Sequence, residues 1–297
     1  MKFFPYILLF IAFGFTACND VIDVELEEGG RQLVVDAFIN DLAQEQVVKL
    51  RYTDAYFSNR FAPTVPNAQV TITSDGGEVY NFEDPDNDGD YTWTPTGSNT
   101  FGARGESYTL NIELEGITYT AESAMNRVPP IDSIVAEFRD DEFGEPDGYY
   151  AEFFSVDFSG EGDCYWIKAY KNGIFLNKPQ ELNLAFDAGF TEGSNVDGLA
   201  FIQPIAEFIN PVPDEDEEDD PPYAIGDSIR VEIHSITLDV FRFMEQLRTQ
   251  TTLGDAGIFA EPSTNVPTNI STTSPDERPQ GFFSVSSVSS AEIEVKE

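Results

Sequence analysis

Four aspartates lie close together in the motif Asp84-Pro-Asp-Asn-Asp-Gly-Asp90. Asp84, Asp86 and Asp88 alternate and are followed by a glycine, which is the spacing with which a calcium loop opens. Carboxylate oxygens at this spacing converge on one Ca²⁺, and the glycine permits the tight bend. The twelfth position of such a loop is Pro95 here, where the usual ligand is a glutamate. We therefore expect either a weak calcium site at Asp84, Asp86, Asp88 and Asp90 or an acidic turn between two strands.

The other residue types that do chemistry form no catalytic set in the sequence. His234 is the only histidine, so an HExxH zinc site is impossible and any serine triad would have to be built around His234. It alternates with Arg230 and Glu232 on the polar face of a strand, which predicts a surface position. The sequence contains no P-loop, GxGxxG or GxSxG motif. We expect no enzyme and no cofactor besides calcium, although a carboxylate pair for glycoside hydrolysis stays an alternative.

Two further groups of residues have both a structural and a functional interpretation. The seven consecutive carboxylates Asp214–Asp220 repel one another, which predicts a solvated loop, with a cation- or partner-facing role as the alternative. An aromatic group contributes either core packing or a surface on which a ligand stacks. This group contains Tyr149, Tyr150, Tyr165, Trp166 and Tyr170.

The first residues of the chain have the pattern of a secretory signal peptide. Lys2 is followed by an almost wholly apolar run from Phe3 to Phe15, and small residues precede Cys18. The run is shorter than the ~18 residues that a membrane-spanning helix needs. The pattern predicts a signal peptide over residues 1–17 and, because the cysteine position resembles a bacterial lipobox, lipidation of Cys18. Residues 18–30 are then a lipidated tether.

The chain has one further cysteine, Cys164, in an aromatic, strand-like run. A disulfide between Cys164 and Cys18 would suit an exported protein. If Cys18 is acylated, Cys164 has no partner, and we expect it to behave as a small buried hydrophobic residue.

The charge balance limits what the protein binds. Lys and Arg number 16 against 54 Asp and Glu, which gives a formal net charge of −38. Such a surface repels nucleic acid and anionic lipid, so neither is an expected direct partner. An acyl anchor would therefore have to hold the protein at a membrane.

The hydrophobic pattern predicts a mostly β fold. Seven short strand-like runs at close spacing, with turn signals between them, indicate an immunoglobulin- or transthyretin-like β-sandwich over residues 31–126. Two prolines at 129 and 130 mark a boundary, and a larger β domain is expected over 131–297 with one packed helix at 237–250. Residues 178–222 lack clear periodicity, and so long a connection is either functional or loosely ordered.

The chain resembles an uncharacterised family, a domain of unknown function, of Bacteroidota lipoproteins. Members are typically encoded beside TonB-dependent outer-membrane receptors. The segment from Ala68 to Thr94 also resembles the transthyretin-like or carboxypeptidase-regulatory sandwich. The family resemblance rests on strand and turn segments that follow the lipobox cysteine, namely 33–39, 65–72, 89–91, 108–112, 119–121, 226–229, 235–237, 262–265, 269–270 and 281–284.

The resemblance implies an outer-membrane lipoprotein that acts as a non-enzymatic accessory or binding component of TonB-dependent nutrient uptake. A surface glycoside hydrolase and an adhesion or matrix β-sandwich module are the alternatives. Asp20, Asp23 and Glu25, just behind Cys18, resemble export signals of Bacteroidota surface lipoproteins. Whether the protein faces the medium or the periplasm stays open, and so does its ligand.

Overall fold

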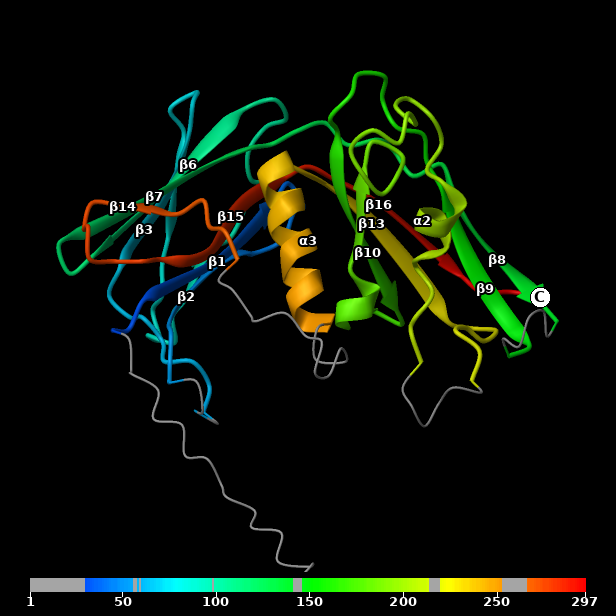
Figure 1. Ribbon diagram of the computed structural model, residues 1–297, viewed down its shortest axis with the longest axis horizontal. Helices are drawn as coiled ribbons and strands as arrows, with labels where there is room; N and C mark the ends of the chain where they lie inside the picture. Colours follow the sequence, from blue (N-terminus) through cyan, green and yellow to red (C-terminus); the bar gives the residue numbers. More distant parts are fainter. Residues whose placement is uncertain are drawn as a thin grey trace, which may run out of the picture. The chain divides into compact units, whose positions relative to one another are not determined.

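The computed structural model describes residues 30–55, 58, 60–97, 99–140, 146–213, 220–252 and 266–297 (Figure 1). Strands hold 44% of the described residues and helices 9%, so the prediction of a mostly β fold is confirmed. The strands form four sheets. Their bounds are β1 (Leu33–Asn40), β2 (Gln46–Tyr52), β3 (Gln69–Ser74), β4 (Val79–Phe82), β5 (Asp90–Trp93), β6 (Ser107–Leu114), β7 (Ile117–Ala124), β8 (Ser133–Arg139), β9 (Gly148–Phe154), β10 (Cys164–Lys171), β11 (Ile174–Phe175), β12 (Asn183–Phe186), β13 (Ser228–Ile236), β14 (Ser271–Thr272), β15 (Gln280–Ser286) and β16 (Val288–Glu294).

The first two sheets enclose one hydrophobic core. One has the order β15-β1-β2-β5 and the other the order β14-β7-β6-β3-β4. Alternate residues of each strand point into the core, which is the period-two pattern that the sequence shows. Leu33, Val35 and Ala37 of β1 meet Leu110 and Ile112 of β6 in this core. This is the sandwich that the alternation over residues 31–126 predicts.

The sandwich is completed by a segment from near the end of the chain. β15 pairs with β1 in parallel, with Val34 opposite Gln280, and β14 pairs with β7. Figure 1 shows β15 lying beside β1. The predicted division placed residues 280–286 in the second part, whereas the structure places their side chains Phe283 and Val285 in the first core. Two parallel strands need a long connection, and here residues 41–279 lie between the end of β1 and the start of β15.

The second core lies on one face of a sheet with the order β11-β10-β13-β16, in which β12 also pairs with β10. Ile229, Val231 and Ile233 of β13 point into this core, where the β8–β9 hairpin and the short helix α2 (Gln203–Glu207) cover them. Arg230, Glu232 and the other alternate residues of β13 therefore lie on the opposite face of the sheet. That face belongs to the candidate site described below.

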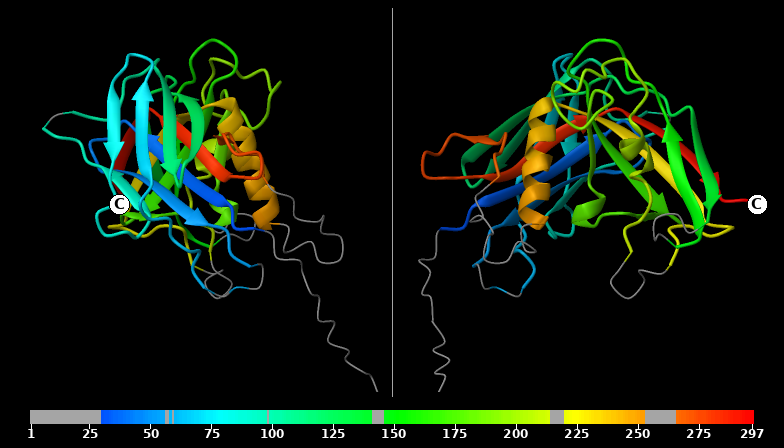
Figure 2. Two further views of the ribbon diagram at one scale, coloured as in Figure 1. Left: turned by 90° about the vertical axis from the view of Figure 1, so that its left-hand side faces the viewer. Right: turned by 45° about the vertical axis from the view of Figure 1, so that its right-hand side comes forward.

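The helix α3 (Leu238–Thr252) is the one long helix of the described residues and confirms the prediction at 237–250. Thr237 caps its start, because its hydroxyl accepts the Val240 N–H at 3.4 Å. Its apolar face includes Phe241 and Met244, which pack in a third cluster with residues of β10, β12 and β15. Figures 1 and 2 show α3 near β1, β15 and β10. None of the helices in the described ranges has the length and apolar character to span a bilayer.

A buried polar joint connects the chain between the two cores. The Ser235 hydroxyl donates to the Asn126 carbonyl at 2.9 Å, and the Asn126 amide donates to the Ile236 carbonyl at 3.3 Å. The Ser287 N–H donates to the Ser235 hydroxyl at 3.0 Å. Three segments far apart in sequence are thereby held together where β13, β15 and β16 meet, and this fixes the two sheets that bound the candidate site.

Candidate functional site

A cavity of about 420 Å³ lies where β1 and β15 of the first sheet approach β10 and β11 of the second, with α3 along one side. A short 3₁₀ helix, η2 (Pro179–Glu181), contributes to its wall. Its lining is mainly apolar, and cavities of this size and character are the usual sites for small ligands. Five aromatic side chains line it, namely Phe38, Trp166, Phe175, Phe243 and Phe282.

The aromatic side chains that line the cavity also pack against one another. Phe38 and Trp166 meet edge to face with their ring centroids 5.7 Å apart, so a residue of β1 contacts a residue of β10 across the site. Phe243 of α3 lies 4.7 Å from Phe282 of β15 by the same measure. Edge contacts of this kind favour one arrangement of the rings. The cavity wall is therefore preformed by contacts between elements that the sequence separates widely.

Four charged side chains also line the cavity: Asp36, Lys178, Glu181 and Arg248. Glu181 accepts the N–H of Lys178 at 2.8 Å with one oxygen and that of Val212 at 2.9 Å with the other. Lys178 donates to the Val212 carbonyl, and Arg248 donates to the Leu182 carbonyl at 3.3 Å. These three side chains thus hold backbone segments in place, and Asp36 differs from them, as described below.

Beside the cavity, Glu232 is the centre of a buried polar network on the outer face of β10 and β13. Its carboxylate accepts the Tyr170 hydroxyl at 3.0 Å and pairs with Arg230 at 3.0 Å and with His234 Nε2 at 3.1 Å. Burial raises the pKa of Glu232, but the hydrogen bonds from His234 and Tyr170 and the Arg230 charge outweigh it, so the pKa lies below its ordinary value. Glu232 is therefore ionised at neutral pH.

Lys168 contributes a second charge to this face. It lies opposite Glu232 in the β10–β13 register, and its ammonium sits 3.8 Å from the centroid of the Trp166 ring. Burial lowers the pKa of Lys168 to about 8, against the attraction of Glu232 and Asp36. A cation above an indole face is a favourable contact, so the Trp166 ring holds the Lys168 ammonium in place beside the cavity.

His234 is buried, and the prediction that it lies at the surface is wrong. The alternation correctly placed it on the face with Arg230 and Glu232, but Trp166 and Val288 stand opposite it on the two neighbouring strands and cover it. Burial lowers the pKa of His234 to about 4, and the Lys168 charge acts in the same direction, against the hydrogen bond to Glu232. His234 is therefore neutral at pH 7.

The imidazole signals of His234 are expected to stay unchanged in the proton NMR spectrum between pH 8 and about pH 5.5, because the buried ring resists protonation. The unfolded chain in urea should titrate near the ordinary value of ~6.5. Because the folded-state pKa is depressed, the contribution of His234 to stability is complete above the unfolded pKa. It is lost as the pH falls from there towards 4, by at most about 1.4 kcal/mol per pH unit. As the chain has one histidine, a native signal titrating above pH 6 would contradict this prediction.

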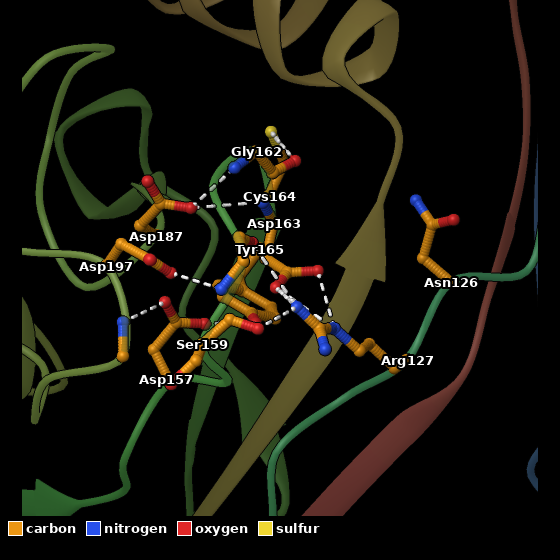
Figure 3. Close-up of polar contacts among 12 residues, drawn as sticks. Asn126, Arg127, Asp157, Ser159, Gly162, Asp163, Cys164, Tyr165, Asp187 and Asp197 are labelled. Carbon is orange, nitrogen blue, oxygen red and sulfur yellow. Dashed lines mark hydrogen bonds and ion pairs between the residues drawn. The ribbon is translucent and has the colours of Figure 1, made fainter.

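Three further aspartates, Asp157, Asp187 and Asp197, place carboxylate oxygens within 4.8 Å of one another at the other end of β10 (Figure 3). Asp157 and Asp187 are buried. Oxygen ligands this close suit a hard divalent cation such as Ca²⁺. Burial raises the pKa of Asp157, with smaller opposing effects of its hydrogen bonds to Tyr165 and Gly198. The sequence analysis did not identify this cluster, because its members come from three separate loops.

Hydrogen bonds from the protein account for the position of each carboxylate in this cluster. Asp157 accepts the Tyr165 hydroxyl at 2.6 Å, and Asp187 accepts the Gly162 N–H at 2.8 Å. Asp197 accepts the Gly160 N–H at 2.8 Å. Next to the cluster, the Arg127 guanidinium pairs with Asp163, as Figure 3 shows. The hydrogen bonds of the three aspartates therefore connect the loops that carry them.

The predicted calcium motif is a turn between β4 and β5 that hydrogen bonds to itself. Oxygens of Asp84, Asp86 and Asp88 lie within 4.8 Å of one another, but Asp84 accepts the N–H of Asp88 at 3.1 Å and that of Gly89 at 3.0 Å. Asp90 points elsewhere and pairs with Arg51 of β2. The structure thus brings the first three predicted ligands together and separates the fourth. Calcium binding at this turn stays a prediction.

The remaining candidates from the sequence occupy different environments. Trp166 lines the cavity, whereas its neighbour Tyr165 is fully buried in the second core. Cys164 is buried as expected, and burial raises the pKa of its thiol to about 12. Cys18 and most of the acidic run, residues 214–219, lie outside the described residues.

A family model described as domain of unknown function (DUF4249) matches residues 19–292. No curated protein matches the chain.

Proposed function

The chain belongs to the DUF4249 family, and from this membership, the leader and the cavity we propose that it is a lipid-anchored outer-membrane protein that binds a small ligand for TonB-dependent nutrient uptake. In this proposal Cys18 carries the lipid, the acidic residues behind it form the tether, and the folded unit Arg31–Glu297 is a non-enzymatic accessory or binding component. The partner is a TonB-dependent receptor in the same membrane.

The observation that carries the binding role is the cavity of about 420 Å³ between β1, β10, β15 and α3. Its volume and aromatic lining suit a small molecule, and its wall is built from packed side chains that need no ligand to form. The net charge of −38 favours neutral or cationic ligands over anionic ones. These features support a protein that captures a nutrient near the membrane and delivers it.

The carboxylates of the cavity favour binding over glycoside hydrolysis. A glycosidase needs two carboxyl groups that are free to act on the substrate. Both oxygens of Glu181 accept backbone N–H groups, so Glu181 is committed to holding η2 against the segment at Val212. Among the lining residues that the structure describes, Asp36 is the other carboxylate, and a single carboxylate can orient a bound ligand.

Affinity purification of the tagged full chain from native membranes tests the proposed role. We expect a TonB-dependent receptor to be recovered with the wild-type chain after mild cross-linking. The variant Cys18→Ala lacks the acceptor for the lipid, and we expect it to leave the outer-membrane fraction and to recover the receptor poorly. Recovery of no receptor with the wild-type chain, from cells grown on a nutrient that needs such uptake, would contradict the proposal.

A further inference from the structure

Asp36 occupies an unusual position in the cavity. It is the exposed residue of β1, and it points away from the first core with Phe282 of β15 opposite it on one side and Lys49 of β2 opposite it on the other. Within the described part of the chain its carboxylate makes no hydrogen bond and no ion pair. Asp36 is therefore a charged group that lines the cavity and is available to a ligand.

The surroundings of Asp36 favour the binding of a cation to its carboxylate. The Asp36 carboxylate is open to the cavity but has protein strands on both sides, and this partial burial raises its pKa, together with the Asp90 charge and against the attraction of Lys49, Lys168 and Arg51. A cation that pairs with such a carboxylate gains more than it would at an open surface, because less water competes for both charges. The other charged side chains of the lining already hold backbone groups.

The rings near Asp36 suit the same kind of ligand. Phe38 is two residues after Asp36 on β1, and Phe282 lies opposite Asp36 on β15. Trp166 packs against Phe38. Aromatic faces attract organic cations and pack against apolar groups. A hard divalent metal ion takes six or more oxygen ligands, which one carboxylate among aromatic rings does not provide, and an anion would be repelled by Asp36.

We infer that the cavity binds an organic ammonium compound, with its nitrogen at Asp36 and its hydrophobic body against Phe38, Trp166 and Phe282. The inference deepens the proposed function, since it names the ligand class of the same cavity. The competing arrangement is an anion held by Lys168, whose ammonium lies over the Trp166 ring. The two arrangements predict opposite preferences for the charge of the ligand.

Fluorescence titration with three matched probes separates these possibilities. The probes are phenylbutylamine, phenylbutanol and phenylbutyrate, which share one body and differ in the charge of the head group. The full chain is held in lipid nanodiscs at pH 7 and carries Trp93→Phe, so that Trp166, the other tryptophan of the chain, reports from the cavity. We expect phenylbutylamine to bind most tightly and phenylbutyrate most weakly.

Three variants identify the group responsible. Asp36→Asn should weaken phenylbutylamine binding by about tenfold or more, the usual value for a hydrogen bond between charged groups, and leave phenylbutanol unchanged. Asp75→Asn, in the exposed turn after β3, is the matched control and should bind all probes as the parent does. Lys168→Gln should leave amine binding unchanged or strengthen it, because it removes a like charge.

Lowering the pH provides a measurement that needs no substitution at Asp36. Amine affinity should fall as the carboxyl group of Asp36 takes up a proton, while phenylbutanol affinity stays constant. The inference is overturned if phenylbutyrate binds more tightly than phenylbutylamine, if Asp36→Asn binds the amine as the parent does, or if none of the probes binds. Receptor recovery does not depend on these probes, so failure of the uptake role and failure of ammonium binding are separate results.

Discussion

Replacing Gly281 by alanine is expected to lower the free energy of unfolding by about 2–5 kcal/mol, because two costs add at this position. Gly281 has a φ of +87°, a conformation that costs a residue with a side chain about 1–2 kcal/mol. A Cβ atom there would also lie 1.9 Å from the carbonyl oxygen of Val35 on the paired strand. The clash is with backbone, so no side-chain rotation relieves it, and β15 must move away from β1.

Gly77 provides the matched control, since its φ is also +87° and a Cβ atom there would meet nothing within 4 Å. Gly77→Ala should therefore show the conformational cost alone, about 1–2 kcal/mol. Chemical denaturation of the two variants measures the difference. Equal losses of stability in both would show that the close approach of β15 to β1 does not matter.

Gly281→Ala should also alter the cavity. Gly281 and Phe282 are lining residues on β15, and Val35 and Asp36 line it from β1. Any separation of the two strands displaces these walls relative to each other. Cavity binding is thus expected to weaken in a variant whose substitution adds one methyl group and no charge.

Replacing Glu232 by alanine is expected to cost about 3 kcal/mol of stability, the lower end of the range for breaking a buried ion pair. The Glu232 side chain is 4% exposed and satisfies Arg230, Tyr170 and His234. Its removal leaves a guanidinium and a hydroxyl without their acceptor and a nearby Lys168 without its counter-charge. The estimate is kept low because the Arg230 side chain is 35% exposed and can turn to water.

Glu292→Ala is the comparison for this substitution. Glu292 lies on β16 directly opposite Arg230, but it is exposed, and exposed carboxylates contribute within about 1 kcal/mol. Thermal and denaturant unfolding at pH 7 should separate the two variants clearly. If Glu232→Ala were as stable as Glu292→Ala, the network would be a surface feature and not a buried one.

Much of the fold could be predicted from the sequence because it follows from alternation. β3 and β6 show a period of two in their sequences, the runs at β1 and β2 are apolar and bounded by turns, and α3 shows its apolar stripe. The segment 178–222 could not be predicted, since its strand β12 is buried on both faces and has no alternation to detect. The helix α2 has five residues, which is too short for a periodic signal.

The site was harder to predict than the fold, and the reason is physical. Trp166 was one of five aromatic candidates, but its role depends on Phe38, which lies more than a hundred residues earlier and reaches it only through tertiary packing. Asp36 looked like an ordinary polar residue on the outer face of a strand. Its distinction arises because β15 and the β10 sheet surround it, and β15 joins β1 by a parallel pairing that local patterns do not encode.

The pairing of β15 with β1 also has a consequence for the synthesis and folding of the chain. Val34 can pair with Gln280 only after residue 280 has been synthesised, and contacts between such distant residues form slowly. Until then β1 presents a bare edge, which delays closure of the amino-terminal half. For the exported precursor proposed above, this delay would be an advantage, because a chain that has not yet folded can cross a membrane. A product truncated before residue 280 would keep that open edge, and we expect it to be degraded faster by proteases than the full chain.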